Sequence, residues 1–193
     1  MIIKLGEIAE IHAGQSIREK IENTTDGSYY IIQIKDVDSL LGINQSSLYK
    51  TNIKGKGTPK LVNKGDLLFV PRVFRESLPY SVVVNIDIPN LIVAPTFYLI
   101  SVNKEFIRTE YLCWFINSDA YGGKFFKKNA WGSSILNIPK NILIEMEVIV
   151  PPLNIQDKFV NFITATRKEK EIMDQLYQKR LTFIDEAVNK YLN

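Results

Sequence analysis

The chain has 193 residues, 46% of them hydrophobic, which is enough for one domain of about 150 residues and an appendage. Its net charge of +3 hides an uneven distribution, because residues 50–75 and 120–140 hold more excess positive charge than the whole chain, which favours binding to a polyanion. No apolar run reaches the ~18 residues of a membrane span, and the charged start MIIKLGEIAEI is unlike a secretory signal, so we expect a cytoplasmic protein with no membrane role.

The first 140 residues are rich in predicted strands. The segment KLGEIAEIHAG predicts a short helical turn and then a strand that stops at Gly14. Runs of β-branched and aromatic residues predict further strands within residues 28–37, 66–74, 80–88 and 92–102, with a turn at 64–66. A helix that Thr109 caps is expected next, followed by a basic helix in AYGGKFFKKNA. Strands outnumber helices without regular alternation, so the predicted class is α+β with a mixed or antiparallel sheet.

The end of the chain changes from a strand pattern to a helix pattern. From Ile144 to Val150 apolar residues alternate with Glu145 and Glu147, as in a half-buried strand. Pro151 and Pro152 then interrupt any sheet, and residues 154–193 contain neither glycine nor proline. These residues predict one helix of roughly 60 Å, which Asn154 can cap and in which the charged segment RKEKE leaves room for a bend or a break.

An apolar stripe runs along this helix. A helix that projects beyond its domain cannot bury such a stripe alone, so we expect it to pair with another helix as a coiled coil; folding back onto its own domain is the alternative. The division is therefore a domain over residues 1–153 and a spacer helix over residues 154–193. The residues expected at the helix pairing interface are Phe159, Ile163, Met173, Leu176, Leu181, Ile184 and Val188.

The sequence offers little for catalysis. His12 is the only histidine, which excludes histidine-rich metal sites within one chain. There is no GxxxxGK[ST] phosphate loop. The pair Glu145 and Glu147 raises the possibility of a metal-dependent nuclease, but the solvent face of a strand explains their spacing. Cys113 lies in the apolar run YLCWFI and is expected to be a buried structural thiol.

Residues suited to nucleic-acid binding are more frequent. Lysines separated by glycines in KTNIKGKGTPK suit contact with phosphates, and arginines beside aromatic residues in FVPRVFRESLPY suit reading of guanine edges. The segment KFFKKNAWGSS adds aromatic and hydroxyl groups to a basic run. The alternative is that the lysines only solvate loops. The candidate DNA-binding residues are Lys54, Lys56, Lys60, Arg72, Arg75, Lys124, Lys127, Lys128, Trp131, Ser133 and Ser134, with Tyr29, Tyr30 and Gln33 as second choices.

The order of these motifs resembles the specificity subunits of type I restriction-modification systems over nearly the whole chain. The segments that carry the resemblance are KLGEIAEIHAGQSI, YYIIQIKDVD, LVNKGDLLFVPR, LIVAPTFYLI, YLCWFINS and GSSILNIPKNILIEMEVIVPPLNIQDKFV. The most specific part is the Gly-Ser-Ser turn, the apolar strand and Pro-Pro-Leu-x-x-Gln before a coiled-coil helix. Ile155 departs from the family pattern, which often has an acid there.

The resemblance implies a non-catalytic subunit whose target-recognition domain reads one half of a split DNA site. The helix after the two prolines would act as a spacer that docks methyltransferase subunits and, through them, the endonuclease subunit. S-adenosylmethionine would belong to those partners, and this chain would bind no cofactor or metal. With one recognition domain and one helix, the chain resembles a half-length subunit that forms a symmetric homodimer on two inverted half-sites. A protein-interaction adaptor without a DNA role is the alternative.

Overall fold

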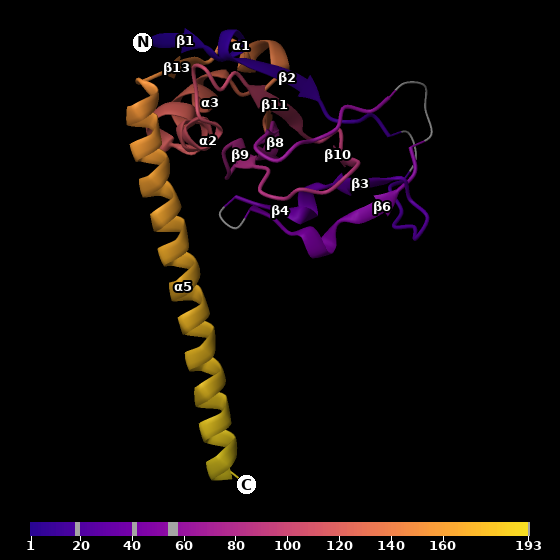
Figure 1. Ribbon diagram of the computed structural model, residues 1–193, viewed down its shortest axis with the longest axis vertical. Coiled ribbons are helices and arrows are strands. Elements are labelled where there is room, and N and C mark those ends of the chain that lie inside the picture. Colours follow the sequence, from indigo (N-terminus) through magenta and orange to yellow (C-terminus); the bar gives the residue numbers. More distant parts are fainter. Residues whose placement is uncertain (18–19, 40–41, 54–57, 193) are drawn as a thin grey trace.

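A computed structural model describes residues 1–17, 20–39, 42–53 and 58–192. It confirms the α+β class, with several sheets and a long C-terminal helix (Figure 1). The strands are β1 (Ile2–Lys4), β2 (Ala9–Ala13), β3 (Tyr29–Ile32), β4 (Val37–Asp38), β5 (Gly42–Ile43), β6 (Tyr49–Thr51), β7 (Leu67–Val70), β8 (Arg72–Phe74), β9 (Tyr80–Val83), β10 (Leu91–Val93), β11 (Tyr98–Val102), β12 (Ile135–Asn137) and β13 (Glu147–Ile149). The helices are α1 (Leu5–Ile8), α2 (Thr109–Asn117), α3 (Lys124–Asn129), α4 (Lys140–Leu143) and α5 (Leu153–Leu192), with shorter helical turns η1 (Ile34–Asp36), η2 (Gln45–Ser47) and η3 (Asp119–Gly123).

The central sheet has four antiparallel strands in the order β2, β11, β7, β9. Both of its faces are buried. Successive side chains of a strand point to opposite sides, so a strand of this sheet contributes to two cores. In β7, Leu67 and Phe69 join the core beneath α1, α2 and α3, whereas Leu68 and Val70 join a second core on the other face. All four side chains are buried, so β7 reads as an unbroken apolar run in the sequence.

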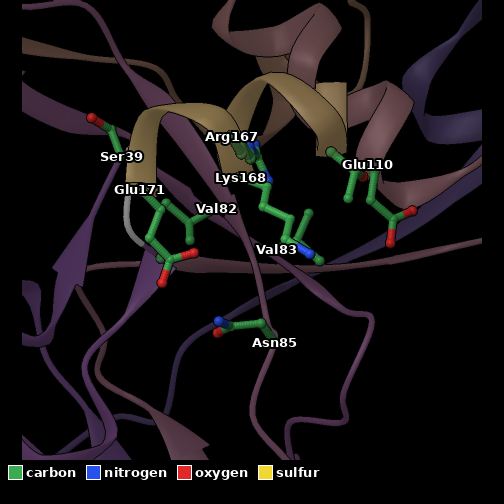
Figure 2. A pocket seen from close by; sticks show the side chains of 10 residues that line it. Ser39, Val82, Val83, Asn85, Glu110, Arg167, Lys168 and Glu171 are labelled. Carbon is green, nitrogen blue, oxygen red and sulfur yellow. The ribbon is translucent and has the colours of Figure 1, made fainter. Parts of the chain in front are cut away.

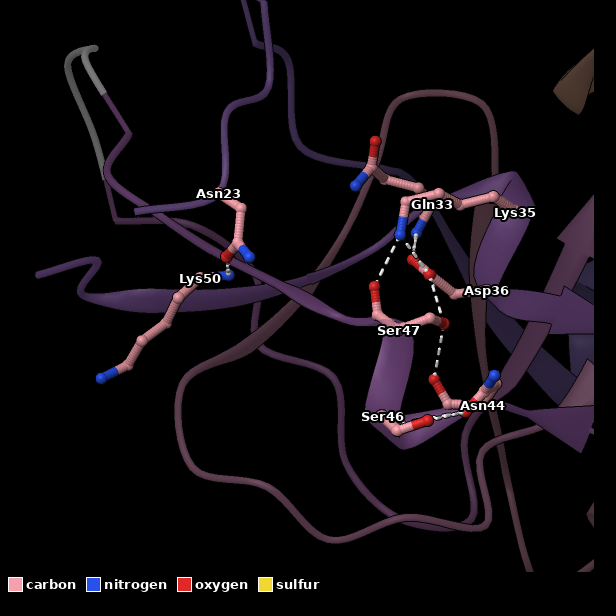
Figure 3. Close-up of polar contacts among 8 residues, drawn as sticks. All are labelled: Asn23, Gln33, Lys35, Asp36, Asn44, Ser46, Ser47 and Lys50. Carbon is pink, nitrogen blue, oxygen red and sulfur yellow. Dashed lines mark hydrogen bonds and ion pairs between the residues drawn. The ribbon is translucent and has the colours of Figure 1, made fainter. Parts of the chain in front are cut away.

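A second sheet covers the second core. Its strand β3 is parallel to β10 and antiparallel to β6, which makes this sheet mixed. Beside it the buried carboxylate of Asp36 ties η1 to η2: its Oδ1 accepts hydrogen bonds from Ser47 Oγ at 2.7 Å and from Lys35 Nζ at 2.5 Å, and its Oδ2 accepts one from the Gln33 N–H at 2.9 Å (Figure 3). These bonds offset the cost of burying a charge.

The two ends of the domain are joined directly to each other. β1 pairs antiparallel with β13, and α5 begins after Val150 with Pro151 and Pro152 between them. Gln156, one turn into α5, is fully buried. Its Oε1 accepts a hydrogen bond from the Arg108 N–H at 2.8 Å, and its Nε2 donates to the carbonyls of Phe106 at 2.9 Å and Pro151 at 2.8 Å. This amide fixes the start of α5 to the start of α2.

Helix α5 is continuous from Leu153 to Leu192, and its C-terminal half extends away from the globular part (Figure 1). Its first turns pack on α2, where the ring of Phe159 stacks on Trp114 with centroids 5.8 Å apart. From Thr164 to Tyr191 every side chain is exposed except Ala187, which is partly buried. Within the residues that the structure describes, no helix is long and apolar enough to cross a bilayer.

A groove of about 620 Å³ separates the middle of α5 from the domain. Figure 2 shows Arg167, Lys168 and Glu171 of α5 on one side of it, with Val82 and Val83 of β9 among the residues opposite. Glu110 of α2 also lines this groove, so it carries charges of both signs. That mixture does not suit a phosphate backbone.

Several local expectations are wrong. Thr109 does not cap α2: it is the first helical residue, Arg108 stands at the cap, and the Thr109 hydroxyl donates to the Gly65 carbonyl at 2.9 Å. Asn154 does not cap α5, because the helix already includes Leu153. The charged segment at 167–171 introduces no break.

Several predicted strands are also shorter than expected or divided in two. The strand predicted to begin at Ile144 starts only at Glu147, since Ile144 has right-handed helical backbone angles at the end of α4. The run 92–102 is two strands, β10 and β11, because a turn at Pro95 separates them. The run 66–74 is also two strands, β7 and β8, on either side of Pro71, and the run 80–88 is a strand only over Tyr80–Val83. The run 28–37 contains β3, the helical turn η1 and the first residue of β4. The turn at 64–66 and both helices after Thr109 are present as predicted.

Candidate nucleic-acid interface

The candidate interface is built on β8, β12 and the backbone of Trp131. β12 pairs antiparallel with β8, with Asn137 opposite Arg72 and Ile135 opposite Phe74. Trp131 pairs with Asn137 on the other edge of β12. Directly paired residues share one face of a sheet, so Trp131, Asn137 and Arg72 form a row across this face. The next row holds Ile135 and Phe74.

This face points to solvent. Along β8 the exposed residues Arg72 and Phe74 flank Val73, whose side chain packs against the second core. Trp131 is 68% exposed, although its backbone N–H and carbonyl both pair with Asn137, at 3.0 and 2.8 Å. Arg72 donates from Nε to Asn137 Oδ1 at 3.2 Å, which orients the guanidinium and leaves its two terminal nitrogens as the donors for a base edge.

The loop between Trp131 and β12 is fixed by glycine and by Arg75. Gly132 has φ +123°, and a Cβ there would lie 1.9 Å from the Ile135 carbonyl oxygen. Arg75 donates from its backbone N–H to the Ser134 carbonyl and from Nη1 to the Ser133 carbonyl, both at 3.2 Å. Both serine side chains are exposed. Candidate residues from two distant segments of the sequence are therefore neighbours. One segment contains Arg72 and Arg75, and the other contains Trp131, Ser133 and Ser134.

Three lysines lie close to this face. Lys124, Lys127 and Lys128 are exposed on α3, which ends two residues before Trp131. Phe126 points the other way and is fully buried against Phe69, with ring centroids 5.6 Å apart. This anchor holds α3 so that its lysines are directed away from the core. The second basic segment thus continues into the row of Trp131, Asn137 and Arg72.

The second-choice residues lie on another sheet. Tyr29 and Tyr30 are partly buried on β3, and the ammonium of Lys50 on β6 lies 5.6 Å from the centre of the Tyr30 ring. The backbone of Lys50 donates to Asn23 Oδ1 at 3.0 Å (Figure 3). Gln33 follows β3, and among the described residues its buried Nε2 has no hydrogen-bond partner. These groups do not join the face of β8 and β12.

The first of the two basic segments, residues 50–75, lies only partly within the described residues. Lys60 is exposed in the connection between β6 and β7. Lys54 and Lys56 lie outside the described residues. Their expected role in binding phosphates stays a prediction.

The sequence patterns did not single out three residues of this face: Phe74, Ile135 and Asn137. The alternation in Arg72-Val73-Phe74 was a signal for Phe74, because residues two apart on a strand share a face. No local signal existed for Ile135 and Asn137, since their place depends on pairing between segments about 60 residues apart.

Other chemical candidates find structural explanations. Glu145 forms an ion pair with Lys4 at 2.6 Å, and Glu147 is an exposed residue of β13. In the part of the chain that the structure describes, no cluster of three or more His, Cys, Asp or Glu residues could hold a metal. Cys113 is free and buried, as predicted, and burial raises the pKa of its thiol above the ordinary value.

Comparison with known proteins agrees with this architecture. Residues 1–179 match the family model of the type I restriction modification DNA specificity domain. A match over this much of the chain means that the protein belongs to that family. Comparison with curated proteins gives no significant match.

Solved structures share the fold at low sequence identity. A chain of a type I R-M system, solved in work on its complex assembly and conformational transition, matches with a TM-score of 0.66 and 21% identity over 91% of this chain and 44% of its own length. The HsdS subunit from Thermoanaerobacter tengcongensis gives 0.60 and 20% over the same shares. The type I S subunit from M. genitalium gives 0.58 and 13%, over 91% of this chain and 41% of its own. The chain thus spans less than half the length of the structures it matches.

Proposed function

We propose that this chain is the DNA-sequence-recognition component of a type I restriction-modification enzyme and has no catalytic role of its own. Residues 1–153 form the recognition domain and residues 154–193 form the spacer helix, although Gln156 and Phe159 already pack on the domain. The chain directs methyltransferase (M) subunits, and through them the restriction (R) subunit, to a bipartite DNA site.

The observation that carries this proposal is the row of Trp131, Asn137 and Arg72 beside the α3 lysines, in which Trp131 and Arg72 are exposed and Asn137 is partly buried. Arginine and asparagine are the side chains that pair bidentately with guanine and adenine, whereas lysines neutralise phosphates. A single surface therefore combines groups that distinguish bases with groups that bind any DNA. An adaptor with no DNA role has no need of this combination.

The exposed apolar stripe of the spacer helix favours its pairing with a second helix. The residues of α5 that line the groove next to the domain are polar or charged, among them Thr164, Arg167 and Glu171. At about 100° per residue, most of the apolar stripe falls on a different side of the helix. The stripe is exposed: Met173 59%, Leu176 40%, Leu181 39%, Ile184 54% and Val188 48%. We infer that two copies pair through this stripe as a homodimer, which places two recognition domains on inverted half-sites.

A salt series with duplex DNA tests the DNA-binding role. Replacement of Lys124, Lys127 and Lys128 with alanine should weaken binding to all sequences alike and flatten the dependence of log K on log salt by about one unit for each phosphate that is no longer neutralised. The matched control replaces Lys168, Lys179 and Lys190, three exposed lysines of α5. An unchanged slope in the α3 variant would remove that helix from the interface. A wild-type chain with no salt-dependent affinity for duplex DNA would favour the adaptor.

A further inference from the structure

The face of β8 and β12 exposes three large apolar side chains that the fold does not use. Phe74 is 73% exposed, Trp131 68% and Ile135 53%. Phe74 and Ile135 are direct cross-strand partners, so their side chains stand next to each other. Val73, which points to the opposite side, is the residue of β8 that packs on the core. Contiguous exposed apolar groups of this kind usually mark a binding surface.

The surroundings of the Phe74 and Ile135 pair favour nucleic acid over protein as the occupant. Arg72 lies on β8 and Arg75 directly follows this strand, and the three lysines of α3 precede Trp131. Glu76 is the acid that follows Arg75 in the chain. Protein interfaces are depleted of lysine, whereas a surface with mostly positive charge around apolar side chains complements a polyanion that contains stacked bases.

The apolar pair is also held rigidly. The ladder between β8 and β12 continues in the bonds from the Ile138 N–H to the Pro71 carbonyl, at 3.0 Å, and from the Arg75 N–H to the Ser134 carbonyl, at 3.2 Å. Gly132 closes the loop with a backbone angle that other residues rarely adopt. A rigid support is required for a side chain that must separate stacked bases, because a mobile one would be displaced instead.

We propose that Phe74 and Ile135 form an apolar wedge that enters the DNA at one base step, partly unstacks it and kinks the duplex. This inference rests on the proposed function and extends it. Unstacking costs free energy, which the burial of two apolar side chains and closer approach of the flanking cations to phosphates offset. The row of Trp131, Asn137 and Arg72 lies directly beside the wedge, so the bases next to the kink are the ones it reads.

The experiment uses the full chain and a duplex of about 30 base pairs carrying the sequence that the wild-type chain selects from a random pool. 2-Aminopurine placed at successive positions reports unstacking, and energy transfer between dyes at the two ends reports bending. For the wild type, fluorescence should rise at one base step and the ends should approach. Phe74→Ala and Ile135→Ala should reduce both signals and weaken binding to the selected duplex about tenfold, with the salt slope unchanged.

Controls separate the possible failures. Phe106→Ala removes an exposed ring outside this face and should change neither signal. If Phe74→Ala retains full unstacking and affinity, the wedge is excluded and the patch is a protein-docking surface. A second outcome also excludes the wedge. If the wild type does not bend the duplex, and if uracil in place of thymine weakens its binding as much as Phe74→Ala does, Phe74 contacts a thymine methyl group instead. If the wild type selects no sequence, the proposed function itself fails and the wedge with it.

Discussion

Gln156 shows how one buried amide controls the junction between the domain and α5. Its side chain satisfies one backbone donor and two backbone carbonyls at 2.8–2.9 Å. The sequence motif Pro-Pro-Leu-x-x-Gln contains this residue, but the pattern alone gave no reason for the amide. The structure supplies the reason, because the Phe106 carbonyl and the Arg108 N–H come from a segment 48–50 residues earlier in the chain.

We predict that Gln156→Ala lowers the free energy of unfolding by about 2–4 kcal/mol, because each backbone group left buried without a partner costs about 1–3 kcal/mol. Gln156→Glu should be similarly damaging, since its carboxylate would face two carbonyl oxygens. Urea denaturation measures both. Gln175→Ala, at an exposed position of α5, is the matched control and should change stability little. If Gln156→Ala lowers the free energy of unfolding only slightly, water replaces the amide as the partner of these backbone groups.

The thiol of Cys113 gives a second prediction at this scale. Burial raises the pKa of this acid, so the folded state holds its proton at a pH where the unfolded chain ionises. Reaction with a thiol reagent at about pH 8 should therefore be slow in buffer and fast in urea, and unfolding should become easier as the pH rises above the pKa of an ordinary cysteine. Rapid labelling of the native protein would contradict the burial.

At the scale of elements, α5 has an unpartnered apolar stripe. Full burial of one large aliphatic side chain contributes about 1.5–3 kcal/mol, so five such residues are sufficient to drive pairing. The helix does not use these residues against its own domain, since all five are at least 39% exposed. Phe159 and Ile163 differ, because the ring of Phe159 already packs on Trp114 and Ile163 is partly buried.

We predict that Leu176→Glu combined with Leu181→Glu converts a dimer into a monomer, because it places two charges in the helix interface. Sedimentation equilibrium at tens of micromolar measures the change, which should leave the melting of the domain unaltered. Gln178→Glu with Thr182→Glu adds the same charge on another side of the helix and should leave the dimer intact. A monomeric wild-type chain would contradict the homodimer and leave the stripe for a methyltransferase subunit.

At the scale of the whole molecule, dimerisation would link two recognition surfaces. Once one domain is bound, binding of the second becomes effectively intramolecular, which can raise affinity by about 10²–10⁴-fold without any additional interaction. We predict that the chain prefers DNA with two inverted half-sites at the correct spacing over DNA with one half-site. The Leu176→Glu, Leu181→Glu variant should lose this preference and keep its affinity for a single half-site. Equal wild-type affinity for both duplexes would exclude the linked arrangement.

Much of the fold follows from local sequence. β-branched and aromatic runs predicted β3, β7, β9 and β11 because such residues fit a pleated, buried surface. The helical spacing of Phe159 through Val188 predicted α5, because its period differs from that of a strand. Local patterns misplaced the ends of elements. Thr109 and Asn154 both suit a helix cap, but where each helix begins is set by packing, such as the bond between Thr109 and Gly65.

By itself, the sequence determined the α+β class, the long terminal helix and the concentration of positive charge in two segments, since composition and periodicity express these properties locally. Only the tertiary structure decided that Trp131, Asn137 and Arg72 form one row, that Phe74 stands beside Ile135, and that Tyr29 and Tyr30 belong to another sheet. The physical reason is that strand pairing between distant segments depends on the free energy of the whole core, which no short stretch of sequence contains.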